Sequence, residues 1–161
     1  DGPIAIRYPR GSAHQGLQEY QAPVEYGRSE IIRKGKKIAV LGVGSMIPSC
    51  MEICKGLKDD GYDPTFVNAR FVKPLDVDLL DELAKDHSLF VTVEENVKSG
   101  GYGEHVSAYM EACHPEIRVL SAAVWDRFVP QGNVESLRSR IGLGVEDIRQ
   151  AIEDSEELRE Q

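Results

Sequence analysis

The chain has 161 residues, of which 41% are hydrophobic, so it is long enough for one well-packed core and short for two full domains. Its formal net charge of −8 argues against a nucleic-acid or membrane-surface partner, because either would require a basic face. Three cysteines indicate a reducing compartment without a disulfide framework, and we expect neither a membrane span nor a signal peptide.

The N-terminal part of the chain falls into a short strand and a loose connection. Residues 4–8 are apolar and strand-like, but Asp1-Gly2-Pro3 is not a natural domain start, so the chain looks cut from a longer protein. Glycine, proline and scattered polar residues without a sustained period follow. We therefore expect residues 1–11 to end one domain and residues 12–35 to form an extended, exposed linker.

Residues 36–161 alternate between strand and helix patterns and form the main domain. Strands are expected at residues 37–43, 65–72, 89–93 and 117–124. Helices are expected from an N-cap at Ser45 to about Asp60, from Pro74 to about Asp86, and at residues 103–113, 134–141 and 145–158. Strands separated by helices of this length predict an α/β fold with a mostly parallel sheet covered on both faces.

The junction Asn68-Ala69-Arg70-Phe71-Val72-Lys73-Pro74-Leu75-Asp76 is the most informative stretch of the sequence. Proline suits a first helical position, and an acid in the first turn suits the positive end of the helix dipole. Such strand-to-helix corners are where α/β proteins usually place their sites.

Two further patterns are interpreted as structural. Gly42-Val43-Gly44 lies between a strand and a helix, but the third glycine of a dinucleotide fingerprint is replaced by Ile47, which favours a tight turn. Cys50 and Cys54 lie one helical turn apart on a stripe with apolar neighbours, which favours buried thiols over metal ligands.

Glu94 and Glu95 end a strand, where a general acid or base would face a cleft. Adjacent residues on a strand point to opposite sides, so a paired carboxylate dyad is not expected and structural roles are favoured. The glycine turn Gly100-Gly101-Tyr102-Gly103 is suited either to cradling a phosphate or to a flexible entry into the next helix, and the sequence leaves both open.

The four histidines have no metal-ligand spacing and are interpreted as surface or packing residues; they are His14, His87, His105 and His114.

Arg7 and Arg10 leave the first strand and enter a glycine turn, which makes this segment the best candidate for substrate contact. A guanidinium can bind two phosphate oxygens at once in a way that lysine cannot. Because side chains alternate along a strand, only one of the two arginines is expected to face a ligand. The alternative is a salt bridge at a domain junction.

Four motifs, in order along the chain, resemble those of the 1-deoxy-D-xylulose 5-phosphate synthases. They are Ile-Ala-Ile-Arg-Tyr-Pro-Arg-Gly at residues 4–11, the junction at residues 68–76, Val-Thr-Val-Glu-Glu-Asn with the glycine turn at residues 91–103, and Phe-Val-Pro-Gln-Gly at residues 128–132. The resemblance implies the last strand of a pyrimidine-binding domain, a linker, and a transketolase-type C-terminal domain. Its fold would be a three-layer α/β/α domain with a five-stranded, mostly parallel sheet and one antiparallel edge strand.

The resemblance also implies a function for the full-length protein. That family of homodimeric transferases joins pyruvate to glyceraldehyde 3-phosphate with loss of carbon dioxide, in isoprenoid, thiamine and pyridoxal biosynthesis. Its chemistry belongs to thiamine diphosphate and Mg²⁺, which upstream domains would bind, so the fragment alone is expected to be inactive. Arg10 is the one residue to which the resemblance assigns a ligand, the phosphate of the aldehyde substrate; no catalytic, cofactor or metal residue is expected. The location would be cytoplasmic in a bacterium and plastid in a plant or alga.

Other functions remain open at this point. The same kind of domain forms the C-terminal part of the β subunit of 2-oxoacid dehydrogenases and of transketolase itself. The sequence of residues 70–76, however, points away from the dehydrogenases. From another class, the chain would be a noncatalytic α/β interaction module.

Overall fold

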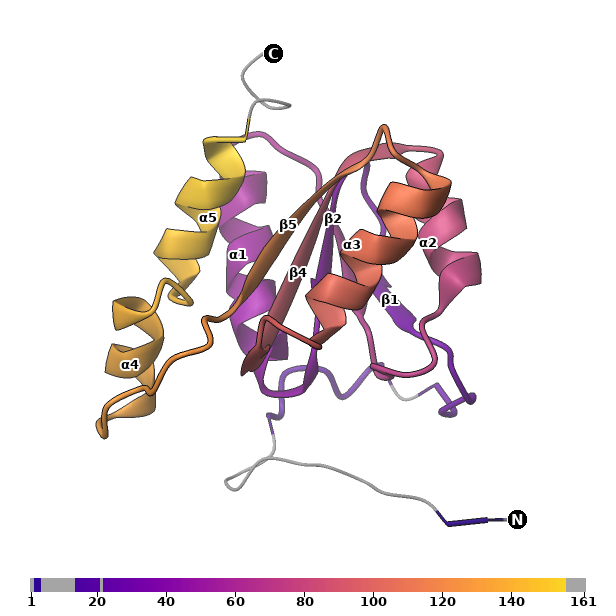
Figure 1. The fold of residues 1–161 in the computed structure, drawn as a ribbon. Coiled ribbons are helices and arrows are strands. Elements are labelled where there is room, and N and C mark those ends of the chain that lie inside the picture. The colour runs from indigo at the N-terminus through magenta and orange to yellow at the C-terminus, as the bar shows by residue number, and fades with distance from the viewer. Residues whose placement is uncertain (1, 4–13, 21, 156–161) are drawn as a thin grey trace.

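The computed structural model describes residues 2, 3, 14–20 and 22–155, and these build one sheet between two layers of helices (Figure 1). The strands are β1 (Glu30–Arg33), β2 (Lys37–Gly42), β3 (Thr65–Asn68), β4 (His87–Val97) and β5 (Arg118–Val124). The helices are α1 (Ile47–Asp59), which a 3₁₀ turn at Gly44–Met46 precedes, α2 (Val77–Ala84), α3 (Tyr102–Cys113), α4 (Val134–Arg140) and α5 (Val145–Glu153).

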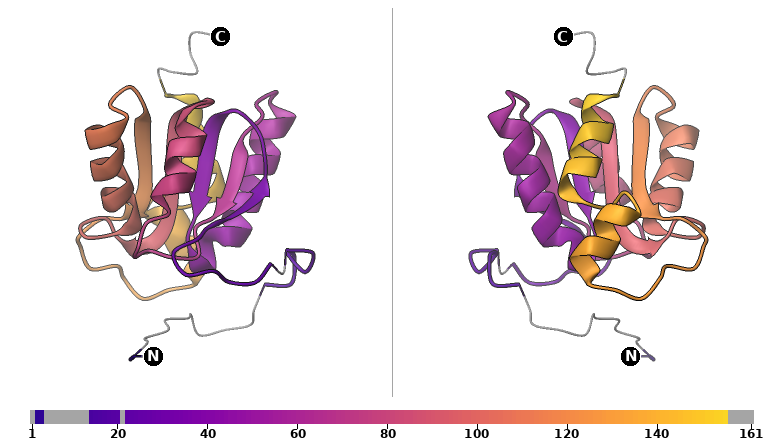
Figure 2. Two further views of the ribbon diagram at one scale, coloured as in Figure 1. Left: turned by 90° about the vertical axis from the view of Figure 1, so that its right-hand side faces the viewer. Right: turned by 90° about the vertical axis from the view of Figure 1, so that its left-hand side faces the viewer.

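The five strands lie in the order β1-β3-β2-β4-β5. Strand β1 pairs antiparallel with β3, and the other three pairings are parallel. The predicted fold class is therefore confirmed, including the antiparallel edge strand. Helices α1 and α5 cover one face and α2 and α3 the other, and the two side views of Figure 2 show these layers.

Alternation along β4 divides the core between the two faces. Leu89, Val91 and Val93 pack with α1 and α5, whereas Phe90 packs with α2 and α3. All four side chains are fully buried. A strand buried on both faces reads as a continuous apolar run, which is why the sequence located this strand.

Strand β1 lies within residues 12–35, which the sequence led us to expect as an extended linker. Only Ile31 and Ile32 separate its charged ends, so the apolar signal is too short to stand out. Pairing with the edge of β3, and not local propensity, makes this segment a strand.

Several boundaries differ from the prediction. Strand β3 ends at Asn68 because its partner β2 ends at Gly42, and Arg70 then adopts a positive φ of 51°. Helix α2 begins at Val77, not at Pro74, with Asp76 as its N-cap. Ser45 does not cap α1, which begins at Ile47 with Pro48 in its first turn. Strand β4 extends beyond the predicted residue 93 because its pairing with β5 resumes at Val97.

The two cysteines of α1 are buried in the core, as the sequence predicted. Cys50 and Cys54 pack among apolar side chains of α1, α5 and the sheet, and burial raises the pKa of both thiols, that of Cys54 to about 12. Cys113 is exposed. Thiol reagents attack the thiolate, so the buried pair is unreactive in the folded chain.

We therefore predict that a thiol reagent at pH 8 titrates about one cysteine per folded chain and all three in guanidinium chloride. A colorimetric disulfide reagent measures this directly. A Cys113→Ser variant serves as the control and should show almost no reaction until it is unfolded. Fast reaction of two or more thiols in the folded chain would contradict the packing.

Candidate functional site at the carboxyl end of the sheet

The candidate site lies where the parallel strands β2, β3, β4 and β5 end, because loops at the carboxyl ends of strands carry the sites of open α/β sheets. The polar residues singled out by the sequence meet here. Glu94 and Glu95 lie near the carboxyl end of the inner strand β4, Arg70 follows β3, and the glycine turn leads into α3. The antiparallel β1 begins at this end, since Glu30 pairs with Asn68.

Glu94 is a buried carboxylate that caps helix α3. Its Oε2 accepts a hydrogen bond from the backbone amide of Tyr102 at 2.9 Å, and its Oε1 accepts one from Gly103 at 2.8 Å. The side chain is 1% exposed, so these bonds and the positive end of the helix dipole stabilise the charge. A β-carbon at Gly101 would lie 2.6 Å from Oε1, so glycine is required for this close approach.

The glycine turn is therefore a helix entry closed by a side chain of the same domain. The amides of Tyr102 and Gly103 are the donors that would hold a phosphate, and Glu94 already occupies both. Of the two interpretations that the sequence left open, the structure supports the structural one.

Glu95 points to the other face of the sheet, as alternation requires. Its carboxylate accepts two bonds from Arg138 of α4, from Nε at 3.0 Å and from Nη2 at 3.2 Å. It also accepts the hydroxyl of Ser45 at 2.7 Å. Glu95 thus joins β4 to the turn before α1 and to α4, and the two glutamates do not form a dyad.

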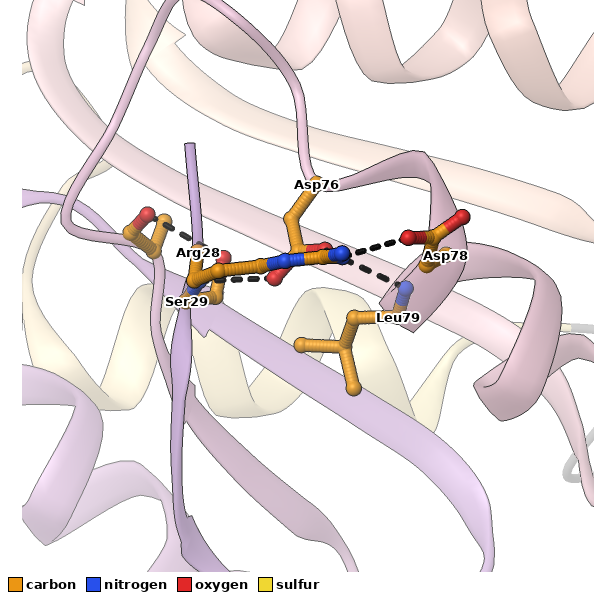
Figure 3. A network of polar contacts seen from close by, with 6 residues as sticks. Arg28, Ser29, Asp76, Asp78 and Leu79 are labelled. Atoms are coloured by element: carbon orange, nitrogen blue, oxygen red, sulfur yellow. Dashed lines mark hydrogen bonds and ion pairs between the residues drawn. The ribbon is translucent and has the colours of Figure 1, made fainter. Parts of the chain in front are cut away.

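The segment before β1 is tied to the start of α2 by a network of charges around Asp76 (Figure 3). Asp76 accepts bonds from the backbone amide of Ser29 at 2.7 Å and from Arg28 at 3.0 Å, and it caps α2 through the amide of Leu79. Arg28 also donates to Asp78 at 2.6 Å. The bond to Asp78 and then that to Asp76 raise the pKa of the Arg28 guanidinium.

Arg70, which follows β3, ties the junction to β1 and to the segment before β1. Its guanidinium pairs with Glu30 of β1 and donates to the carbonyls of Ala22 and Pro23. Both partners of the ion pair are largely buried. The sequence did not show this pairing, because Glu30 lies in the segment read as linker.

Two of the described histidines, His87 and His114, make polar contacts within the domain. His87 is buried; its Nδ1 contacts the carbonyl of Leu83 and its Nε2 the hydroxyl of Thr65, and burial lowers its pKa. His114 pairs with Asp81 at 2.8 Å.

The residues that the structure describes do not fit the cofactor that the resemblance implies. Within this part of the chain, no three histidine, cysteine, aspartate or glutamate side chains converge on a possible metal position. The donors at the glycine turn are taken by Glu94. At the start of the Gly42–Gly44 turn, Gly42 is closely packed, because a β-carbon there would lie 2.8 Å from the sulfur of Cys50. We therefore assign no step of a reaction to these residues.

Two of the sequence-based candidates, Arg7 and Arg10, lie outside the described residues. Among the described helices, none is long and apolar enough to cross a membrane.

The role of Glu94 can be tested by Glu94→Gln in this chain. An amide keeps one acceptor but sets an NH₂ group against the second backbone donor, so we predict a loss of about 1–3 kcal/mol in the free energy of unfolding. Urea denaturation measures it. Glu111→Gln, on the exposed side of the same helix, is the control and should change stability by less than about 0.5 kcal/mol. Unchanged stability in Glu94→Gln would contradict the capping role.

Comparison with known proteins places this geometry in a family. The family model described as transketolase, C-terminal domain, matches residues 27–148. A protein of Lachnoclostridium phytofermentans named 1-deoxy-D-xylulose-5-phosphate synthase is 42% identical to this chain over 149 residues. The match covers 92% of this chain and 24% of that protein. A protein of the same name from Chlorobaculum tepidum is 40% identical over 148 residues, 91% of this chain and 23% of that protein. The chain thus spans about a quarter of the length of these curated relatives.

Solved structures show the same fold. A split-gene transketolase described as an inactive β4 tetramer is 29% identical and has a TM-score of 0.77, covering 84% of this chain and 44% of that one. Transketolase from Campylobacter jejuni has a TM-score of 0.56 at 18% identity, covering 80% of this chain and 19% of that one, and supports the fold alone.

Proposed function

The chain belongs to the transketolase C-terminal domain family, and from this premise we propose that it is the C-terminal domain of a thiamine diphosphate-dependent 1-deoxy-D-xylulose 5-phosphate synthase. The observation that carries the proposal is the 42% identity to a protein of that name over 92% of the chain.

The proposed reaction of the full-length protein condenses pyruvate with D-glyceraldehyde 3-phosphate and releases carbon dioxide. Isoprenoid, thiamine and pyridoxal biosynthesis would use the product. Upstream domains would bind thiamine diphosphate and Mg²⁺, and the enzyme would act as a homodimer in the cytoplasm, or in the plastid of a plant or alga. Within this arrangement residues 1–11 would close the pyrimidine-binding domain, residues 12–35 would connect, and residues 36–161 would form the C-terminal domain.

The geometry of this domain suits a noncatalytic role in the full-length protein. At the carboxyl end of the sheet, Arg28, Arg70 and Arg138 are each paired with carboxylates of the same chain. Arginines neutralised in this way hold loops together and are poorly placed to bind an anionic substrate. The domain would therefore support the connection to the catalytic domains, while the chemistry takes place upstream.

Transketolase is the second candidate, because the split-gene transketolase is also similar at 29% identity. Product analysis of the full-length protein separates the two. The synthase forms 1-deoxy-D-xylulose 5-phosphate from pyruvate, whereas a transketolase requires a ketose donor. A magnesium-diphosphate motif on a separate subunit would instead favour a 2-oxoacid dehydrogenase.

We predict that the 161-residue chain alone does not bind thiamine diphosphate and does not turn over pyruvate. Calorimetric titration of the chain with cofactor and Mg²⁺ should give no saturable heat, because the described residues offer neither a metal cluster nor free amides at the glycine turn. The full-length protein, titrated in the same buffer, is the positive control. Saturable binding of the cofactor to the isolated chain would contradict the proposal that the upstream domains alone bind it.

Arg10 is proposed to bind the phosphate of glyceraldehyde 3-phosphate. In the full-length protein, Arg10→Ala should raise KM for that substrate about tenfold or more and change KM for pyruvate little, since hydrogen bonds to charged groups contribute about 1.5–3 kcal/mol. Steady-state kinetics with each substrate varied in turn measures this. The matched control is Arg7→Ala, three residues away on the same segment. Equal effects of Arg10→Ala on both KM values would exclude a phosphate contact.

A further inference from the structure

A cleft lies between helix α1 and the edge strand β1, on the face of the sheet that α1 covers. Its volume is about 300 Å³, which is at the lower end of the range of small-molecule sites. It is lined by Leu17, Glu19 and Tyr20 of the segment before β1, Ile32 and Arg33 of β1, Met51, Cys54, Lys55 and Lys58 of α1, and Phe66 of β3. We call this space the edge cleft.

Apolar side chains form the inner lining of the edge cleft. Phe66 and Cys54 are 3% and 4% exposed and belong to the core beneath α1. Leu17, Ile32 and Met51 are partly buried and pack against the same core. Ligand sites are mostly apolar in this way, with a few polar groups that fix the orientation of the ligand.

One face of α1 supplies both an apolar base and a cationic rim. Its four lining residues are spaced by three, four and seven positions from the first, which places them on one side of the helix; they are Met51, Cys54, Lys55 and Lys58. The first two lie against the core, whereas the two lysines are exposed.

The two lysines have no protein partner to neutralise them. Lys55 and Lys58 are neighbours on the helix surface, where like charges repel. Within the part of the chain that the structure describes, neither forms a hydrogen bond or an ion pair. Lys58 lies in the last turn of α1 and favours the helix dipole, but Lys55 lies before that turn, where the effect is small. An anion at the rim would relieve their repulsion.

A β-bulge turns Arg33 toward the same cleft. Ile31 pairs with Val67. The next residue of β3, Phe66, pairs with Arg33, which leaves Ile32 as an extra residue in β1. Because opposed residues of antiparallel strands point to the same face, Arg33 shares the α1 face with Phe66. Regular alternation would have sent it to the other face, and bulges often re-aim side chains beside sites.

Arg33 is held in place without a close carboxylate. Its Nη2 donates to the carbonyl of Pro64 at 2.6 Å, whereas its Nη1 lies 3.8 Å from the half-exposed carboxylate of Asp63, beyond hydrogen-bond distance. The charge acts on the lining: burial raises the pKa of Cys54 to about 12, and Arg33 opposes the rise. A fixed guanidinium beside an apolar surface suits an anionic head group.

Charge and volume define the ligand. Three cations and one carboxylate, that of Glu19, line the edge cleft of a chain with a net charge of −8, so the local charge favours an anion. A water molecule occupies about 30 Å³ of liquid, so the cleft holds a ligand of about ten non-hydrogen atoms and is too small to enclose a nucleotide.

We propose that the edge cleft binds a small amphipathic organic anion. An apolar body of about six to eight carbon atoms would fill the inner lining, and a carboxylate or phosphate head group would lie between Lys55, Lys58 and Arg33. This site goes beyond the proposed function and does not depend on the reaction that the full-length protein catalyses.

Nuclear magnetic resonance of the ¹⁵N-labelled 161-residue chain tests the proposal with octanoate and hexyl phosphate. At least one of them should shift the amides of residues 32–33 and 51–58 in a saturable way, with a Kd of about 1 mM or lower, and leave α3 on the other face unchanged. The tighter of the two identifies the head group. No saturable shift with either ligand would overturn the proposal.

Inorganic phosphate and 1-hexanol are the controls for the two halves of the ligand. Each should bind about tenfold more weakly or less, because the first has no apolar body and the second no charge. Equal binding of inorganic phosphate would reduce the site to a cationic surface, and equal binding of 1-hexanol would reduce it to an apolar hollow. Either result would overturn the proposal.

Removal of the rim charges should weaken binding. The double variant Lys55→Gln, Lys58→Gln should raise Kd about tenfold or more, because charge-assisted hydrogen bonds to the head group are lost. Lys34→Gln, Lys36→Gln is the matched control, since both lysines are exposed and lie outside the cleft. It should change Kd by less than about twofold. Equal Kd values for the two double variants would overturn the proposal.

Calorimetric titration of the full-length polypeptide with the tighter ligand completes the test. We expect a Kd similar to that of the 161-residue chain, and the same increase in the Lys55→Gln, Lys58→Gln variant, which distinguishes this cleft from anion sites on other domains. A full-length polypeptide whose binding is insensitive to the double variant would overturn the proposal. Activity of the enzyme is not measured, so failure of the proposed function would appear separately, as a full-length polypeptide that binds the ligand but forms no 1-deoxy-D-xylulose 5-phosphate.

Discussion

The bond between the Glu94 carboxylate and the first amides of α3 is the constraint on which the carboxyl end of the sheet depends. It buries a charge, which is favourable only because two backbone donors and the helix dipole face it. The bond fixes α3 to β4 and closes the glycine turn. Since neighbouring side chains alternate, it also directs Glu95 to the opposite face, where Ser45 and Arg138 bind it. One pair of adjacent acids thereby anchors elements on both sides of the sheet.

Periodicity in the sequence predicted most of the fold, because the central strands and the helices have apolar faces that are long enough to recognise. The inner strand at Lys37–Gly42 and the helix at Tyr102–Cys113 were placed within about one residue. Where pairing decides the structure, the sequence was less informative. Strand β1 was missed, since Ile31 and Ile32 alone carry its apolar pattern, and β3 was drawn too long because the end of its partner is not visible locally.

The sequence likewise predicted some features of the candidate site and missed others. Alternation correctly separated Glu94 from Glu95, but no local signal revealed that Glu94 binds the amides of Tyr102 and Gly103, which lie eight and nine residues further along. The partner of Arg70 was also out of reach, because Glu30 comes from the misread segment. The family motifs were more informative about the family than any single side chain, and the residue to which they assign the substrate, Arg10, lies outside the described part.

The antiparallel direction of β1 has a consequence for the order in which the domain is made. Its partner β3 is synthesised much later, after β2 and α1, so the first strand of the domain has no edge to join when it leaves the ribosome. The parallel unit of β2, α1 and β3 must form before β1 can add to it. Because Arg70 and Asp76 also come from beyond β3, the segment before β1 becomes fixed only after the centre of the domain exists. This segment therefore reaches its final position late in folding, although it is translated before every helix and strand of the sheet that holds it.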